Sequence, residues 1–383
     1  MYLLPPSFEE VQEMKKNNAW NHKHIFSACI GAAALLLLGF SACDFQPAKN
    51  LVDGRPVGGG LALGRPELEE YIESSTGGGS GGATIDTVQS GDKKNFPMLS
   101  KKDIKDLLDK TDAKHLPQNV MAEEPSFTPP YKVGKVKKEA LELSVERLNA
   151  LRRISGLYPV EMSDTDNDNA QYGAFLMKLT NQFKHGGIPK PDGMSEDDWK
   201  KGNNATATSN IYPINNLIGA IDGYNRDPGN PNVGHRLYQM SPGITTVGIG
   251  FVPGSHCEKV IGTSKPTKNL KPDDFDWNFV SYPAAGYFPL EGNLFGSPAF
   301  WHVQFHGDKY TVGAGKIIVT RVDTGEQWVE EHGGGGTIIF NKSNKWRPEL
   351  GTYTFEVTGV RNKDTGIPER FVFTTEFFNR HTL

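Results

Sequence analysis

The 383-residue sequence predicts an α+β fold in which a helical half is followed by a half made of strands. Apolar residues recur at helical spacing from about residue 136 to residue 226, whereas β-branched and aromatic runs fill most of the chain after residue 251. The spacing changes near the Pro- and Gly-rich stretch 283–289. We therefore predict two folding units, 137–285 and 286–383.

Residues 1–42 have the pattern of a secretion signal. Basic residues between 15 and 24 precede an apolar run that ends in Phe40-Ser41-Ala42-Cys43, which resembles a bacterial lipobox. The pattern predicts that Cys43 is lipidated and becomes the new N-terminus; an ordinary cleaved signal or an uncleaved membrane span are the alternatives. We expect a protein of the bacterial cell envelope that faces outside the cytoplasm, either anchored to the membrane by its lipid or secreted.

Residues 43–136 are predicted to form a flexible tether. Glycine runs at 58–60 and 77–82 and the prolines at 129–130 interrupt regular structure, and only 102–108 has the pattern of a short helix. Such a tether would allow the folded part of the protein to lie at a distance from the membrane.

Charge and cysteine content argue against a protein that binds nucleic acid through its charge and against a fold stabilised by disulfides. The formal net charge of −4 gives no basic field, so binding to nucleic acid through charge is not expected. The three cysteines, Cys29, Cys43 and Cys257, provide no disulfide framework. Stability must therefore come from core packing.

Four helices and one strand are expected in the helical half. The first has inward apolar residues from Leu141 and ends at Gly156, and the second ends just before His185. A third is capped by Ser195, and a fourth starts near Pro213. The expected ranges are about 136–156, 166–184, 194–201 and 213–226 for the helices and 245–251 for the strand.

The stretch 230–251 contains the best single functional candidate, His235, between a cluster of turn residues and a glycine-bearing strand. Gly234-His235-Arg236, followed by SPG at 241–243 and VGIGF at 247–251, resembles the GHR…NP…VGFG segment of bacterial CAP-domain proteins. These are relatives of cysteine-rich secretory proteins, antigen 5 and plant pathogenesis-related proteins. The resemblance extends back to about Leu143 and implies an α-β-α sandwich for residues 137–285.

The resemblance also implies a cleft. CAP domains commonly present two histidines and two acidic residues, and in some members the histidines hold a divalent metal. His185 and His235 match the two histidines, and Asp227 lies near the second acidic position. Ser209-Asn210 stands where the family has Glu-Asn. We therefore expect His185, Ser209, Asn210, Asp227 and His235 to line the cleft, with His185 and His235 as ligands of a metal such as zinc.

Less specific interpretations of these residues remain. His235 could be a hydrogen-bonded hinge, and His185 a solvated helix end. Ser209, His235 and Asp227 could form a nucleophilic triad, although no G-x-S-x-G motif accompanies the serine. Cys257 follows His256, but a lone buried cysteine is usually unreactive.

The strand half is predicted from six runs of β-branched and aromatic residues. GTYTFEVTGV and RFVFTTEFF have the pattern of the closing hairpin of an immunoglobulin-like sandwich. The six runs are 276–282, 300–305, 316–322, 337–340, 353–360 and 371–378.

Three functions follow as hypotheses. The first is a non-enzymatic envelope lipoprotein whose cleft binds a small-molecule, lipid or protein ligand. The second is a metal-assisted hydrolase that uses His185 and His235, with Asp227 as base; a further carboxylate within reach of both histidines, such as Glu258 or Glu291, would favour it. The third is an adhesin that acts through its β-domain.

Overall fold

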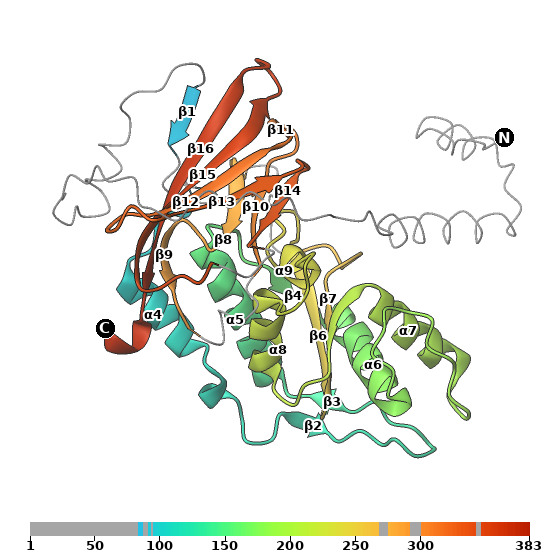
Figure 1. The fold of residues 1–383 in the computed structure, drawn as a ribbon. Coiled ribbons are helices and arrows are strands. Elements are labelled where there is room, and N and C mark those ends of the chain that lie inside the picture. Colours follow the sequence, from blue (N-terminus) through green and yellow to red (C-terminus); the bar gives the residue numbers. More distant parts are fainter. Residues whose placement is uncertain (1–82, 87–90, 93–94, 268–274, 292–299, 342–345) are drawn as a thin grey trace, which may run out of the picture. The chain divides into compact units, whose positions relative to one another are not determined.

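The computed structural model describes residues 83–86, 91–92, 95–267, 275–291, 300–341 and 346–383 (Figure 1). All of them belong to one compact unit, 60–383. The predicted signal and Cys43 lie outside the described residues.

A four-stranded sheet with strand order β4-β6-β7-β5 forms the centre of the helical half. In Figure 1 it lies between α6 and α7 on one side and α5, α8 and α9 on the other, so the expected three-layer α-β-α arrangement is present. Its strands are β4 (Glu161–Met162), β5 (Ser209–Tyr212), β6 (Thr246–Val252) and β7 (Ser255–Lys259). The helices are α5 (Lys138–Ile154), α6 (Asp164–Thr180), α7 (Glu196–Ala207), α8 (Leu217–Arg226) and α9 (Gly234–Gln239).

The glycines of β6 allow α6 to pack directly on the sheet. All seven residues of the strand are buried. A Cβ at Gly248 would lie 2.2 Å from the backbone carbonyl carbon of Asp166, and one at Gly250 would lie 2.1 Å from that of Ala170. Only glycine permits so close an approach.

Two helices differ from their predicted bounds in ways that move site residues. α6 ends at Thr180 because Asn181 adopts a left-handed conformation with φ of 51°. His185 therefore lies in the following loop and not at a helix end, which corrects the prediction. His235 lies in α9, a six-residue helix that the sequence pattern did not predict.

Part of the predicted tether forms regular structure. Ser100 and Asp103 form a capping box at the start of α4, and the helix buries Ile104 and Leu108, which are 1% and 0% exposed. The short helix expected at 102–108 is thus present, and its two buried residues, spaced by four, form the apolar stripe by which it packs on the core. The elements are α4 (Lys101–Lys110), η1 (Ala113–His115), β2 (Met121–Glu123) and β3 (Lys135–Val136).

The C-terminal region is all-β, as predicted. A seven-stranded sheet has the order β1-β16-β15-β12-β13, with β11 paired to β15 and β9 to β16, and a three-stranded sheet has the order β14-β10-β8. β15 and β16 form the predicted antiparallel hairpin. The immunoglobulin-like arrangement stays a prediction. The strands are β1 (Ala83–Asp86), β8 (Phe279–Tyr282), β9 (Gly286–Pro289), β10 (Trp301–Phe305), β11 (Tyr310–Val312), β12 (Gly315–Arg321), β13 (Gln327–His332), β14 (Thr337–Phe340), β15 (Gly351–Asn362) and β16 (Pro368–Phe378).

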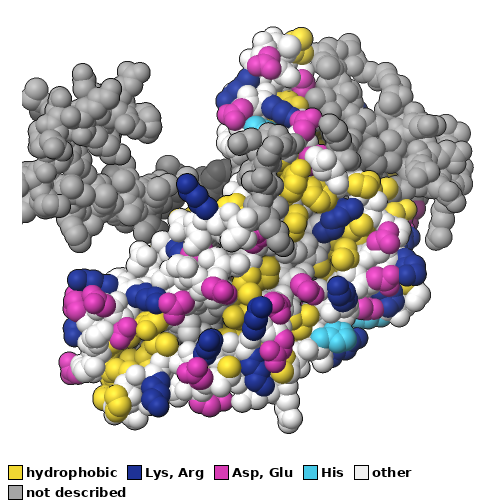
Figure 2. Space-filling model, turned by 180° about the vertical axis from the view of Figure 1, so that it is seen from behind, with side chains coloured by type: hydrophobic (Ala, Val, Ile, Leu, Met, Phe, Trp, Pro, Cys, Tyr) yellow, Lys and Arg dark blue, Asp and Glu magenta, His cyan; other side chains and the backbone are white. Residues whose placement is uncertain are grey.

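The surface carries no area of a single charge sign on the face that Figure 2 shows, where basic and acidic side chains are interspersed over the described residues. Among the helices that the structure describes, none combines the length and the apolar character that a membrane span requires.

Candidate functional site

Two histidines predicted from separate parts of the chain lie next to each other. The ring centres of His185 and His235 are 6.4 Å apart, with an angle of 34° between the ring planes. His185 comes from the loop after α6, and His235 is the second residue of α9. The structure therefore brings both imidazoles to one place.

Hydrogen bonds set the tautomer of each ring. His185 Nδ1 donates to the carbonyl oxygen of Thr206 at 3.1 Å, and His235 Nδ1 donates to Asp227 Oδ1 at 2.8 Å. Because a carbonyl or carboxylate oxygen can only accept, Nδ1 carries the proton in both rings. In the neutral imidazole, Nε2 then keeps its lone pair.

Asp227 is committed to holding the N-terminus of α9. Its Oδ2 accepts from the backbone amides of His235 at 3.0 Å and Arg236 at 3.3 Å, and Asn230 Nδ2 donates to both carboxylate oxygens. Asp227 is itself the C-cap of α8, with φ of 47°. One buried carboxylate thus ends one helix, starts the next and orients His235.

Asn210 and Glu258 lie beneath His235 as a cross-strand pair of β5 and β7. Asn210 Nδ2 donates to the carbonyl oxygen of His235 at 3.1 Å and to Glu258 Oε2 at 2.8 Å, and Gln239 Nε2 donates to Glu258 Oε1 at 3.0 Å. Burial raises the pKa of Glu258 to about 7. Through Asn210, Glu258 helps to hold the backbone of His235 in place.

Ser209 does not join the cleft. It is buried, and its hydroxyl has no hydrogen-bond partner among the described residues. Successive residues of a strand point to opposite faces, so Ser209 faces away from the side chain of Asn210. This excludes Ser209 from a triad with His235 and Asp227 and corrects its assignment as a cleft residue.

His256 and Cys257 are structural. His256 is 0% exposed, Tyr224 Oη lies 3.1 Å from its Nδ1, and burial lowers its pKa to about 3. Burial also raises the pKa of the Cys257 thiol to about 12, so the thiolate that reactivity requires is not formed.

The ring-centre distance is at the upper limit for a shared cation. Two metal–nitrogen bonds of about 2.0–2.1 Å, together with the ring radii, reach this distance only when the two nitrogens lie on opposite sides of the ion, so a tetrahedral ion would draw the rings closer together. Each ring has a hydrogen-bond partner on its other nitrogen, as histidine ligands of metals do. Within the residues that the structure describes, no group of three His, Cys, Asp or Glu side chains could hold an ion. The other positions would be left to water or to a bound molecule.

Neither of the two carboxylates considered for catalysis completes the site. Glu258 is bound by the two amides, and Glu291 forms an ion pair with Arg380 at 2.5 Å. Gln239 and Tyr224, whose ring centre is 5.4 Å from that of His235, were missed by the sequence analysis. A buried Gln or Tyr at helical spacing resembles any core residue, so the sequence contained no signal for them.

Comparison with known proteins agrees with this description. Residues 145–264 match the family model of the cysteine-rich secretory protein family, CAP. The chain therefore contains a CAP domain, and His185, Asp227 and His235 lie within it. No curated protein and no solved structure matches the chain.

Proposed function

We propose that the CAP domain is a non-enzymatic binding module whose ligand is held at His185 and His235, with a divalent cation such as zinc shared between the two imidazoles. The observation that carries the proposal is the 6.4 Å separation of the two rings, each with its Nδ1 already hydrogen-bonded. When bound, the cation would offer its open positions to an oxygen or nitrogen atom of the ligand.

Binding is favoured over hydrolysis because neither Asp227 nor Glu258 is free to act as a general base. Asp227 uses both oxygens as acceptors for His235, Arg236 and Asn230. A carboxylate so engaged orients a ligand histidine rather than removing a proton from water. Glu258 is 0% exposed and cannot contact a bound molecule directly.

Calorimetric titration of the full-length protein with zinc at pH 7.5 tests the proposal. We expect one ion per chain, and loss of binding in His235→Ala and in His185→Ala. His381→Ala is the matched control, because this side chain is 66% exposed and pairs with Glu291. Zinc affinity should fall at acidic pH, because a protonated imidazole has no lone pair to donate. Absence of both zinc and copper binding to the wild type would overturn the proposal.

The cellular setting is a second part of the proposal. The basic and apolar pattern before Cys43 supports a lipid anchor at that residue and a location on the outer side of a bacterial membrane. Partitioning into detergent should be lost in Cys43→Ala if the anchor is correct, and unchanged partitioning would contradict it.

A further inference from the structure

A recess separate from the two histidines lies beside β6, where α6 begins. Its volume is about 570 Å³, and its lining comes from β2, β3, β4, β6 and the first turns of α5 and α6. Small-molecule sites commonly have volumes of about 300–1,000 Å³. None of the cleft residues described above lines this recess, so it would act independently of the proposed function.

The apolar part of the recess is aliphatic. Its four apolar side chains are those of Val136, Leu141, Met162 and Ile249, and no aromatic side chain lines it. Ligands with flat rings, such as nucleobases, are usually held by stacking on aromatic residues. The wall therefore suits branched or linear aliphatic groups, to which a flexible methionine adapts.

Two side-chain amides from α6 line the inner part. Asn167 Oδ1 accepts from the backbone amide of Ile249 at 2.8 Å, and Gln171 bonds both backbone groups of Phe251 at 3.0 Å. These amides complete the hydrogen bonding of β6 where β4 no longer pairs with it. Asn167 is 7% exposed, and its Nδ2 has no hydrogen-bond partner among the described residues. A donor is thus left for an acceptor such as a carbonyl oxygen.

The rim carries unpaired charges of both signs. Lys138 pairs with Glu142 at 3.5 Å, and Asp168 pairs with Lys201. Lys135, Asp164 and Glu123, which is the cross-strand neighbour of Lys135, form no ion pair within the described part of the chain. A rim of this kind is complementary to a molecule that has both a cationic and an anionic end.

We propose that this recess binds a short aliphatic peptide in its zwitterionic form. Lys135 receives the terminal carboxylate, Asp164 receives the terminal ammonium group, and the side chains lie on the aliphatic wall. A peptide carbonyl supplies the acceptor that Asn167 lacks. A small peptide matches all three features of the recess: the aliphatic wall, the two side-chain amides and the rim with charges of both signs. A simple fatty acid or a sugar does not match all three.

The test is calorimetric titration of the full-length protein with trileucine at pH 7.0, where α-amino groups of pKa about 7.7–8.0 are mostly protonated. We expect a single site, weakened about three- to tenfold by Lys135→Gln and by Asp164→Asn, because each removes one charge pair at a partly exposed site. Lys132→Gln and Asp197→Asn are the matched controls. They remove an exposed lysine in the loop before β3 and an exposed acid in the first turn of α7, neither of which lines the recess.

Other probes decide between ligand classes. Triserine should bind more weakly than trileucine, and N-acetyl-trileucine amide, which has no charged end, should also bind more weakly. Equal binding of either probe, binding of decanoate without binding of trileucine, or no binding of trileucine at all would each overturn the proposal. His185→Ala and His235→Ala should leave the trileucine titration unchanged, so failure here is distinguishable from failure of the metal cleft.

Discussion

At the scale of single residues, Glu258 illustrates how burial changes the pKa of a carboxylate close to His235. It is 0% exposed, and the amides of Asn210 and Gln239 donate to its oxygens. These bonds lower its pKa, but burial outweighs them and raises the pKa to about 7. The folded protein therefore keeps a proton on Glu258 in a range of pH where the unfolded chain has lost it.

The sign of the resulting pH dependence follows from linkage. An unfolded Glu has a pKa near 4.3, so between about pH 4.3 and pH 7 the folded state binds more protons at this position, and stability falls as the pH rises. We expect Glu258→Gln to remove this contribution, which is on the order of a few kcal/mol above pH 7. Gln239 Oε1, which has no partner among the described residues, can accept from the new amide.

Chemical denaturation at pH 5 and pH 8 measures the effect. The difference in unfolding free energy, variant minus wild type, should be more positive at pH 8 than at pH 5. The difference between the two proteins is needed because His256, with a pKa lowered to about 3, contributes in the opposite direction. A difference that is the same at both pH values would show that Glu258 is already ionised at pH 5.

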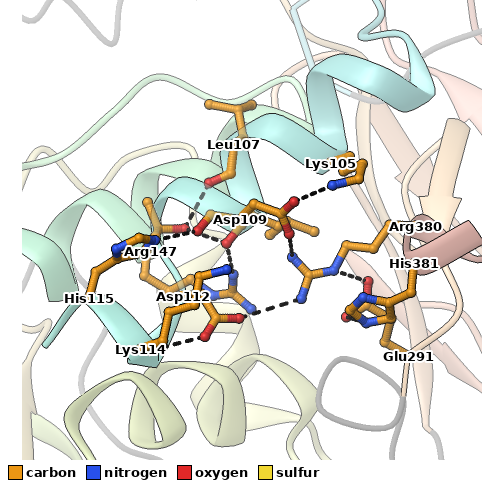
Figure 3. A network of polar contacts seen from close by, with 12 residues as sticks. Lys105, Leu107, Asp109, Asp112, Lys114, His115, Arg147, Glu291, Arg380 and His381 are labelled. Carbon is orange, nitrogen blue, oxygen red and sulfur yellow. Dashed lines mark hydrogen bonds and ion pairs between the residues drawn. The ribbon is translucent and has the colours of Figure 1, made fainter. Parts of the chain in front are cut away.

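At the scale of elements, a clasp holds the C-terminal turn η3 (Arg380–Thr382) on α4. Figure 3 shows the Arg380 guanidinium between Asp109, Asp112 and Glu291. The distances are 3.0 Å from Nη1 to Asp109 Oδ1, 3.8 Å from Nη2 to Asp112 Oδ2 and 2.5 Å from Nε to Glu291 Oε1. The side chain is 3% exposed, so its charge depends on these partners.

We expect Arg380→Met to loosen α4. The change removes the nearer of the two basic side chains that pair with Glu291, whose side chain is 6% exposed, and leaves His381 at 3.8 Å. Removal of one member of a buried pair commonly costs about 3–5 kcal/mol of stability. We expect part of this loss to appear as local opening of α4 and part as a lower free energy of global unfolding. Trypsin should then cleave within residues 101–110 faster than in the wild type, while zinc binding is retained.

Arg370→Met is the matched control for the clasp, because this arginine forms an exposed pair with Glu356 at 3.7 Å. Such pairs contribute little. Equal cleavage rates in all three proteins would contradict the clasp.

The elements that sequence could predict are those with a regular apolar spacing. α5, β6, β10 and the β15–β16 hairpin were predicted within a few residues of their bounds. The resemblance to CAP-domain proteins pointed to His185 and His235, whose ring centres lie 6.4 Å apart. α9 was missed because six residues are too few to show a helical period, and β5 because it begins with Ser209 and Asn210 and so forms no run of β-branched or aromatic residues. The role of Ser209 was misassigned because the face that a strand residue occupies depends on its pairing, which spacing does not reveal.

At the scale of the whole molecule, the helical and strand regions share a core. One buried cluster contains Leu148 of α5 and Val247 of β6 together with Phe279 of β8 and Phe371 of β16. The predicted boundary after residue 285 falls between β8 and its antiparallel partner β10. The division into two folding units stays a prediction. Because of these contacts, we expect a test to show that the two regions fold as one unit.

Arg236 adds a polar link across the same boundary. Its Nη1 donates to the carbonyl oxygen of Phe300 at 2.7 Å, and its guanidinium carbon lies 4.0 Å from the ring centre of Tyr282. Because Arg236 follows His235 directly, the strand region also helps to hold the helix that carries the cleft.

We therefore expect residues 91–285, expressed alone, not to fold cooperatively, whereas residues 91–383 should unfold in one thermal transition. The shorter chain loses the strand beside β8 and exposes Phe279 and Val280, which are 1% and 0% exposed. Each side chain is worth about 1.5–3 kcal/mol when buried, and the lost hydrogen bond to a charged group about 1.5–3 kcal/mol more. Together these approach the net stability of about 5–15 kcal/mol of an ordinary domain. Thermal unfolding followed by far-ultraviolet circular dichroism distinguishes the cases: a sharp transition of the shorter chain, with zinc binding intact, would instead confirm two independent folding units.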